Sequence, residues 1–208
     1  PIVNGFPCEV VLNGVNTDIF CRKVSIDKQK YVLRGLDFSR KIVFHATASF
    51  TDSKNSIKGG YFVIEMAKRM PEVQFVVAAL ASQLSEELPK NVLFWGATKD
   101  QEELAELYNL ADVTLLTSKR ETFSMIVAES LCCGTSVVGF KAGGPESIAL
   151  LECSRFVAYG EIDSLFEALN AMLESRVDKE TVSSMANVQY SKERMGGRYL
   201  EIYNKFFC

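Results

Sequence analysis

The most informative segment of this chain reads Ser118-Lys119-Arg120-Glu121-Thr122-Phe123-Ser124-Met125-Ile126-Val127-Ala128-Glu129-Ser130-Leu131-Cys132-Cys133-Gly134. Before it, residues 111–117 form an apolar run with the length of a buried strand. After a short polar turn, residues 125–133 are mostly apolar and predict a helix. A strand, a turn and a helix make half of a βαβ unit, and open parallel sheets bind ligands where their strands end.

Two glutamates, Glu121 and Glu129, flank the predicted start of this helix. Ser124 has the side chain of an N-cap residue, and the first helical amides, on Met125, Ile126 and Val127, should lack partners and attract phosphate. Glu129 lies one turn further in, where an unpaired carboxylate would be costly to bury. A single glutamate here often only favours the helix dipole. The pair, beside free amides, instead indicates a ligand with both phosphates and hydroxyls, such as a nucleotide sugar.

The rest of the pattern predicts an α/β fold. Strands are expected at residues 41–46, 73–79, 92–95, 113–117, 137–140 and 155–158, and further helices at 61–70, 101–109, 162–173 and 192–207. Alternation at this spacing predicts a doubly wound parallel sheet of about six strands with helices on both faces. Paired glycines are a known cause of kinks, so Gly196-Gly197 indicates either a kink in the last helix or an ordinary terminal helix with a weak spot.

Composition excludes several classes of protein. The 208 residues are 48% hydrophobic, which suits one well-filled core. The net charge of −3 argues against a dominant basic face for nucleic acid. No apolar run approaches the ~20 residues of a membrane span. The segment Ala142-Gly143-Gly144-Pro145 lacks the G-x-G-x-x-G spacing of a dinucleotide site.

Cysteine and histidine usage points to a reduced chain without a metal. The six cysteines are Cys8, Cys21, Cys132, Cys133, Cys153 and Cys208. They form no CxxC pair, which favours a cytoplasmic protein over a disulfide scaffold. His45 is the one histidine, and no Cys, Asp or Glu cluster surrounds it in the sequence, so no metal site is expected.

Several motifs resemble, in order, those of one enzyme family. Residues 121–129 resemble the E-x-F-(G/S)-x-x-x-x-E signature of retaining glycosyltransferases of family 4, the glycosyl transferases group 1. Four further motifs are similar to the family's F-x-G, L-Y-x-x-A-D-V, G-x-P-V-V and GG-x-x-E-x-(I/V) patterns, at residues 94–96, 107–113, 133–139 and 142–148. Ser136 takes the place of the usual proline. The resemblance covers nearly the whole chain.

This resemblance implies a domain organisation. Members have the GT-B fold, in which two Rossmann-like domains face each other across a cleft. Residues 10–20 resemble the segment that leads out of the first domain. We therefore expect residues 1–38 to be the interdomain linker and the tail of a missing first domain. Residues 39–208 are expected to be the carboxyl-terminal, Rossmann-like domain that binds the donor nucleotide sugar, and this domain alone should be inactive.

The resemblance also implies roles for individual residues. Lys58 would contact the donor diphosphate and Glu121 the transferred sugar, so these two are expected to be catalytic. Glu129 would bind the ribose hydroxyls. The other expected donor contacts are Gly59, Gly96, Thr122, Phe123, Ser124, Met125 and Ile126. Trp95, beside the family's base-contacting loop, fits a core position as well as a stacking platform.

One element of the family pattern is absent. Members usually carry an arginine near the end of the first strand, but residues 46–50 contain none. Either Lys54 or Lys119 substitutes for it, or stabilisation of the leaving diphosphate is weaker.

The implied activity is transfer of a hexose from a UDP- or GDP-sugar to a glycan or lipid-linked acceptor, with retention and without a metal or other cofactor. The acceptor would be held by the missing first domain, and the setting would be polysaccharide or cell-envelope synthesis. A cytoplasmic enzyme is expected, with peripheral contact at the inner membrane face as an open alternative. Two other functions stay open: a non-catalytic nucleotide-sugar-binding module, and an epimerase of the same architecture.

Overall fold

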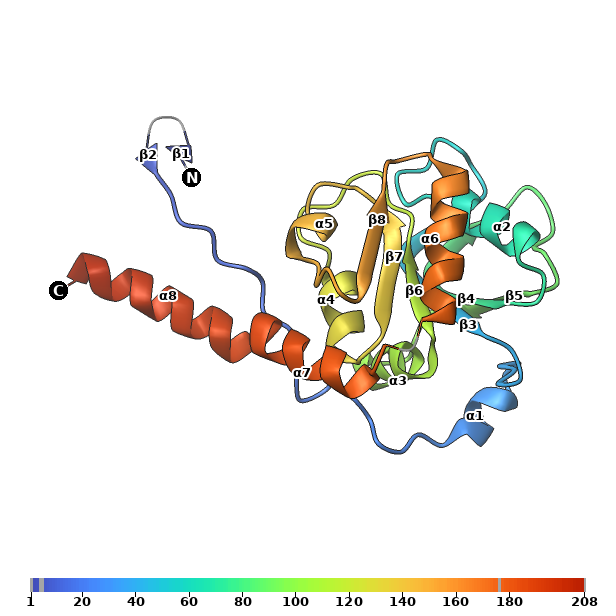
Figure 1. Cartoon of the computed structure of the whole chain (residues 1–208), viewed down its shortest axis with the longest axis horizontal. Helices are drawn as coiled ribbons and strands as arrows, with labels where there is room; N and C mark the ends of the chain where they lie inside the picture. The colour runs from blue at the N-terminus through green and yellow to red at the C-terminus, as the bar shows by residue number, and fades with distance from the viewer. Residues whose placement is uncertain (1, 4–5, 176, 208) are drawn as a thin grey trace.

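One parallel sheet lies at the centre of the molecule, with helices on both of its faces (Figure 1). The computed structural model describes residues 2–3, 6–175 and 177–207. The strands of the sheet are β3 (Ile42–Thr51), β4 (Gln74–Gln83), β5 (Val92–Gly96), β6 (Val113–Leu116), β7 (Ser136–Phe140) and β8 (Ser154–Val157). Their order is β5-β4-β3-β6-β7-β8, and each neighbouring pair is parallel. The predicted α/β class and doubly wound, Rossmann-like sheet are confirmed.

The predicted helices are present, with small shifts at their ends. The described helices are α1 (Lys28–Val32), α2 (Gly60–Arg69), α3 (Gln101–Leu110), α4 (Met125–Cys132), α5 (Pro145–Ile148), α6 (Ile162–Glu174), α7 (Lys179–Tyr190) and α8 (Lys192–Phe207). The sequence did not predict α1, α5 or α7. In α7 the buried residues Val182, Ala186 and Tyr190 recur every fourth position on an otherwise polar helix. A separate antiparallel pair is formed by β1 (Ile2–Val3) and β2 (Phe6–Pro7).

The two faces of the sheet have separate hydrophobic cores. Successive strand residues point to opposite faces, so Val43 packs under α2 and α6, and Phe44 packs under α3, α4 and α7. Both faces of the strands are therefore covered, as expected for a parallel sheet.

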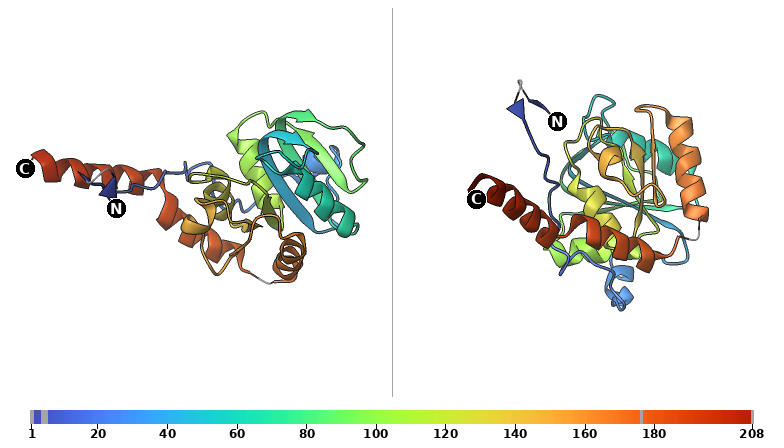
Figure 2. Two further views of the ribbon diagram at one scale, coloured as in Figure 1. Left: turned by 90° about the horizontal axis from the view of Figure 1, so that it is seen from above. Right: turned by 60° about the vertical axis from the view of Figure 1, so that its left-hand side comes forward.

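Part of the expected linker packs into the core that contains Phe44, on the face of the sheet covered by α3, α4 and α7. Val15, Phe20 and Tyr31 are almost completely buried there. The Val15 amide donates to the Tyr190 carbonyl at 2.7 Å, and the Lys192 amide donates to the Val15 carbonyl at 3.0 Å. The segment thus binds where α7 meets α8. Glu9 pairs with Arg198 and Lys205 of α8, and Figure 2 shows this part of the chain outside the body of the sheet. A domain boundary at residue 38 stays a prediction.

The structure decides against a kink in the last helix. α8 runs without interruption through Gly196-Gly197. Glycine keeps its backbone donor and acceptor, so it weakens a helix without having to break it. The chain bends instead at Ser191, which has extended backbone angles between α7 and α8.

Two further features concern membranes and thiols. None of the described helices has the length and apolar character needed to cross a bilayer. The five cysteines within the described ranges are free thiols, and Cys208 lies outside them.

Candidate functional site

The candidate site lies at the carboxyl ends of the central strands. From β3 the chain proceeds outward through β4 and β5 and then returns to β6, on the other side of β3. Neighbouring strands whose connections leave in opposite directions create a crevice, and ligands bind there in open α/β sheets. The loops after β3 and β6 carry the residues that the sequence singled out.

Lys58 and Glu121 meet across this crevice. The Lys58 Nζ lies 2.8 Å from the Glu121 Oε1, although the residues come from different βα loops. Their side chains are 39% and 17% exposed, so both are accessible to a ligand. The two residues expected to be catalytic are thus brought together as an ion pair.

Gly59 sets how closely the two loops approach. Its φ is +70°, and a Cβ at this position would lie 2.2 Å from the Thr117 carbonyl oxygen. The Thr117 hydroxyl donates to the Lys58 carbonyl at 3.1 Å, and the Lys119 amide donates to the Ile57 carbonyl at 2.8 Å. The loop that carries Lys58 is therefore fixed against the end of β6.

A second brace comes from the loop after β7. The Glu121 amide donates to the Ala142 carbonyl at 3.0 Å, and the Gly144 amide donates to the Glu121 carbonyl at 3.1 Å. The Glu146 carboxylate accepts hydrogen bonds from the amides of Ala142 and Gly143, each at 2.9 Å. Glu146 was only one letter of a motif in the sequence, and the structure shows that it fixes the turn behind Glu121.

Ser124 starts α4 in an unexpected conformation. With φ 73° and ψ 85° it is the one non-glycine with positive φ among the described residues. An N-cap side chain normally caps from extended backbone, and Ser124 makes no such bond. Ser124 is therefore the N-cap residue, as predicted, but its side chain does not cap the helix. Strain of this kind is often found at functional sites.

The start of α4 nevertheless offers donors. The Ser124 carbonyl accepts from the Val127 amide at 3.1 Å, so the prediction that this third amide is free is wrong. The amides of Met125 and Ile126 have no hydrogen-bond partner within the described ranges. These amides face outward from the positive end of the helix dipole, which is a favourable place for an anion.

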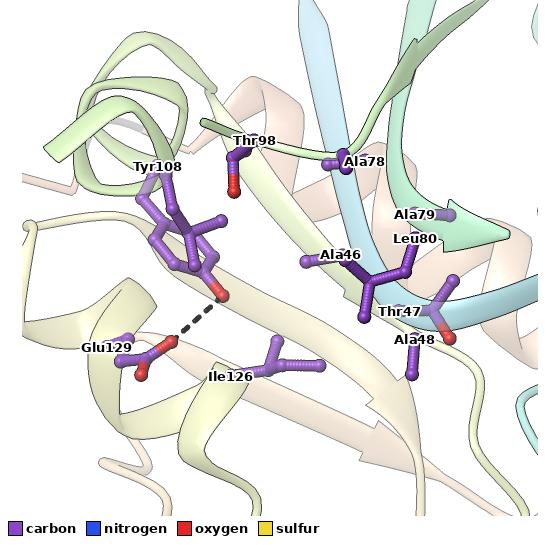
Figure 3. A pocket seen from close by; sticks show the side chains of 12 residues that line it. Ala46, Thr47, Ala48, Ala78, Ala79, Leu80, Thr98, Tyr108, Ile126 and Glu129 are labelled. Carbon is purple, nitrogen blue, oxygen red and sulfur yellow. Dashed lines mark hydrogen bonds between the residues drawn. The ribbon is translucent and has the colours of Figure 1, made fainter. Parts of the chain in front are cut away.

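A pocket of about 300 Å³ opens between the strand ends and α4. Its volume is at the lower end of the ~300–1,000 Å³ typical of small-molecule sites. Small apolar side chains from the ends of β3 and β4 form one wall, and Figure 3 shows Glu129 and Tyr108 on the opposite wall. The loop after β5 contributes Ala97 and Thr98.

Glu129 has the partner that its buried position required. The Tyr108 hydroxyl lies 3.4 Å from the Glu129 Oε2. Burial raises the pKa of the Glu129 carboxyl to about 7, while the hydrogen bond from Tyr108 lowers it. This carboxyl can therefore accept ligand hydroxyls or hold a proton near neutral pH. The sequence showed Tyr108 only as part of the L-Y-x-x-A-D-V pattern.

The remaining residues that were expected to contact the donor differ in how far they are exposed at the crevice. Thr122 and Met125 are exposed at the crevice, while Phe123 packs partly on the core. Trp95 is 6% exposed and belongs to the core, which decides against a stacking platform. The Gly96 backbone, with φ +81°, turns the chain into the pocket loop.

Neither lysine proposed as a substitute for the missing arginine contacts the Lys58–Glu121 pair. The Lys54 Nζ lies 4.9 Å from the centre of the Tyr61 ring, and the Lys119 Nζ lies 5.6 Å from that of Tyr159.

The remaining titratable group near the site is the one histidine. The His45 Nδ1 lies 2.9 Å from the Leu115 carbonyl oxygen. Burial lowers the pKa of His45 to about 4, so the ring is neutral at physiological pH. Across the described ranges, no three His, Cys, Asp or Glu side chains are grouped to hold a metal ion.

Comparison with known proteins identifies relatives of this arrangement. Residues 64–191 match the family of glycosyl transferases group 1. N-acetyl-alpha-D-glucosaminyl L-malate synthase of Bacillus anthracis is 26% identical over 117 residues, which is 54% of this chain and 30% of that protein. D-inositol 3-phosphate glycosyltransferase of Mycolicibacterium smegmatis is 28% identical over 154 residues, or 68% of this chain and 34% of that protein. The chain spans about a third of the length of these relatives.

Solved structures share the fold. Anabaena HepE in complex with UDP-glucose superposes with a TM-score of 0.76 at 20% identity, covering 95% of this chain and 57% of HepE. The C-terminal domain of LpcC from Francisella tularensis gives a TM-score of 0.61 at 19% identity, covering 89% of this chain and 98% of that domain.

Proposed function

This chain belongs to the glycosyl transferases group 1 family, and from this premise we propose that it binds the nucleoside-diphosphate sugar donor of a retaining hexosyltransferase. The observation that carries the proposal is the row of groups along the crevice. Glu121 and Lys58 lie at one end, the free amides of α4 lie next, and the pocket with Glu129 follows. The row has the order of a donor: sugar, diphosphate, ribose and base.

The diphosphate would be held by Lys58 and the amides of Met125 and Ile126. In the structure Lys58 pairs with Glu121. A bound diphosphate offers Lys58 a stronger, doubly charged partner. Glu121 would then accept hydrogen bonds from the hydroxyls of the hexose.

The ribose would bind at Glu129. Ribose hydroxyls are donors, and an ionised carboxylate can accept two of them. The Tyr108 hydroxyl, 3.4 Å away, would keep the carboxylate oriented toward them.

Transfer would be assisted by charge stabilisation. As the bond from the sugar to the diphosphate breaks, negative charge grows on the leaving group. A fixed cation and preorganised amides stabilise this charge without a metal. The UDP-sugar in the structure of HepE supports a nucleotide-sugar donor here. The acceptor would be a hydroxyl-bearing molecule held by a further domain.

A non-catalytic nucleotide-sugar-binding module is the second candidate. It is favoured by the positions of Lys54 and Lys119, which lie over aromatic rings and not beside Lys58. With a single cation at the diphosphate, binding would be kept while the leaving group would be stabilised less.

Isothermal titration of this chain with UDP, GDP and ADP, and with their glucose derivatives, tests donor binding. We expect one nucleotide to bind, and Lys58→Ala to weaken that binding at least tenfold. Lys54→Ala is the matched control, because Lys54 belongs to the same loop and faces Tyr61. If none of the nucleotides binds, the proposed function is wrong.

A further inference from the structure

The end of β5 and the loop that follows it, together residues 95–99 and called the loop below, form one end of the pocket. Ala97 and Thr98 line the pocket, and Figure 3 shows the Thr98 side chain directed into it. The positive φ of Gly96 turns the chain at the start of this loop. The loop contacts whatever occupies the end of the pocket that lies beyond Glu129.

One ion pair holds both ends of this loop. The Arg34 Nη2 donates to the Trp95 carbonyl at 3.2 Å, where the loop begins. The Arg34 Nη1 pairs with the Glu103 Oε1 at 2.7 Å. The other carboxylate oxygen of Glu103, Oε2, accepts from the Lys99 amide at 2.8 Å, where the loop ends. These three contacts all run through the Arg34–Glu103 pair.

The surroundings make this pair rigid. The Arg34 guanidinium lies 3.5 Å from the centre of the Trp95 ring, and the Tyr31 ring stacks on Trp95 with centroids 5.5 Å apart. Glu103 is 3% exposed. Surface ion pairs contribute little, but removing one partner of a buried carboxylate leaves an uncompensated charge. The Arg34 side chain itself is 42% exposed, so the pair joins a partly exposed cation to a buried carboxylate.

We propose that Arg34 and Glu103 are positioning residues that place Ala97 and Thr98 to recognise the base of the donor nucleotide. This inference rests on the proposed function. With the ribose at Glu129 and the diphosphate at Lys58, the base extends to the other end of the pocket, where this loop lies. Base edges carry hydrogen-bond donors and acceptors, which the Thr98 hydroxyl and the loop peptides can match. Such recognition depends on geometry held within about 0.5 Å.

The test compares Arg34→Gln and Glu103→Gln with Lys30→Gln. Lys30, on α1, pairs with Glu106 of α3 at 2.7 Å, whereas Arg34 follows α1 and pairs with Glu103 of the same helix; the partner of Lys30 lies outside the loop. For each variant, dissociation constants are measured for UDP, GDP, ADP and inorganic pyrophosphate. We expect Arg34→Gln and Glu103→Gln to weaken the preferred nucleoside diphosphate about tenfold, the size of one lost charged hydrogen bond. Disfavoured bases and pyrophosphate should change much less, so the preference among bases narrows.

The outcomes separate this inference from the proposed function. If the unmodified chain binds no nucleoside diphosphate, the proposed function fails, and the inference fails with it. If it binds one, and Arg34→Gln keeps the same preference among bases as Lys30→Gln, only the inference is overturned. An equal loss for all four ligands would show a merely structural pair and would also overturn it.

Arg34→Lys provides the test if the glutamine variants do not fold. Lysine keeps the charge beside Glu103 but cannot make the forked contact or stack as a planar group on Trp95. We expect the ratio of dissociation constants between disfavoured and preferred bases to fall in this variant, but by less than in Arg34→Gln. Its melting temperature should stay near that of the unmodified chain. Unchanged base preference in a folded Arg34→Lys variant would contradict the positioning role of the two guanidinium contacts, to Trp95 and to Glu103.

Discussion

Glu129 combines a ligand role with a cost to folding. Burial raises the pKa of its carboxyl from about 4.5 in an unfolded chain to about 7. Between these values the folded chain binds more protons than the unfolded one, so stability falls as pH rises through this window. A glutamate kept at such a cost fits a ligand site better than a structural position.

We therefore expect Glu129→Gln to have opposite effects on stability and binding. At pH 8 the variant should melt at a higher temperature than the unmodified chain, because the neutral amide removes the cost of a buried charge. Its affinity for nucleoside diphosphates should fall about tenfold or more, whatever sugar is attached, since the ribose is common to all donors. Melting curves from pH 5 to 8 and titration calorimetry measure both. Unchanged affinity with lower stability would show that Glu129 is structural.

Lys58 and Glu121 should fail in different ways when mutated. Glu121→Ala should leave the affinity for free nucleoside diphosphate unchanged or improved, because that ligand has no hexose and Lys58 is released from its 2.8 Å ion pair. Lys58→Ala should reduce this affinity and, in a longer protein able to transfer, the rate as well, since the charge it neutralises grows in the transition state.

Calorimetry with the free diphosphate and with the sugar nucleotide separates the two roles. For Glu121→Ala we expect a loss confined to the sugar nucleotide. Equal losses of diphosphate affinity in both variants would mean that the sugar end of the site is assigned wrongly.

At the level of elements, the strands and main helices could be predicted from the sequence, because the spacing of apolar residues or the length of an apolar run indicates each of them. The ends of β3 and β4 could not. Residues 47–51 and 80–83 are largely polar and small, and they form strand only by pairing with each other, from Thr47 with Ala79 to Thr51 with Gln83. That register depends on tertiary structure. α7 was missed for a similar reason, since its apolar stripe is narrow and gains its meaning from packing against α4.

The features of the candidate site also fall into those that the sequence could predict and those that depend on tertiary structure. The resemblance to the family placed Lys58 and Glu121 in one site, and the structure brings their side chains together. The resemblance could not predict contacts between distant residues that belong to no motif, such as the contact of Arg34 with Glu103, 69 positions apart. The left-handed backbone of Ser124 was also out of reach, because a serine before an apolar helix ordinarily indicates a capping side chain.

The junction between the Lys58 loop and β6 can be tested through Gly59. Gly59→Ala should lower the free energy of unfolding by about 2 kcal/mol or more, because a left-handed alanine is strained and its Cβ would meet the Thr117 carbonyl at 2.2 Å. Gly160→Ala is the matched control: its φ is +87°, but no atom lies within 4 Å of the added Cβ. Urea denaturation measures both. A Gly59→Ala variant no less stable than Gly160→Ala would show that the close approach does not matter.

The molecule as a whole presents a donor crevice that is open on one side. The sheet, its covering helices and residues 15–36 form one body, while α8 and the segment before Val15 extend from it (Figure 1). We propose that the groups along the crevice bind the donor and that the acceptor is held by a further domain. The parts that align with this chain make up only about a third of each of the two curated relatives.

We therefore expect this chain of 208 residues to bind its donor but to transfer no sugar. Transfer requires donor and acceptor to be held in one reactive geometry, and the loss of that arrangement can cost ~7–11 kcal/mol of the barrier. Release of nucleoside diphosphate is measured with the preferred sugar nucleotide and a panel of hydroxyl acceptors, after calorimetry has shown that the donor binds. A longer protein that contains this chain and its preceding domain is the positive control. Donor-dependent transfer by the chain alone would contradict the proposal that it is the donor-binding part of a larger enzyme, and would move the acceptor site onto the body described here.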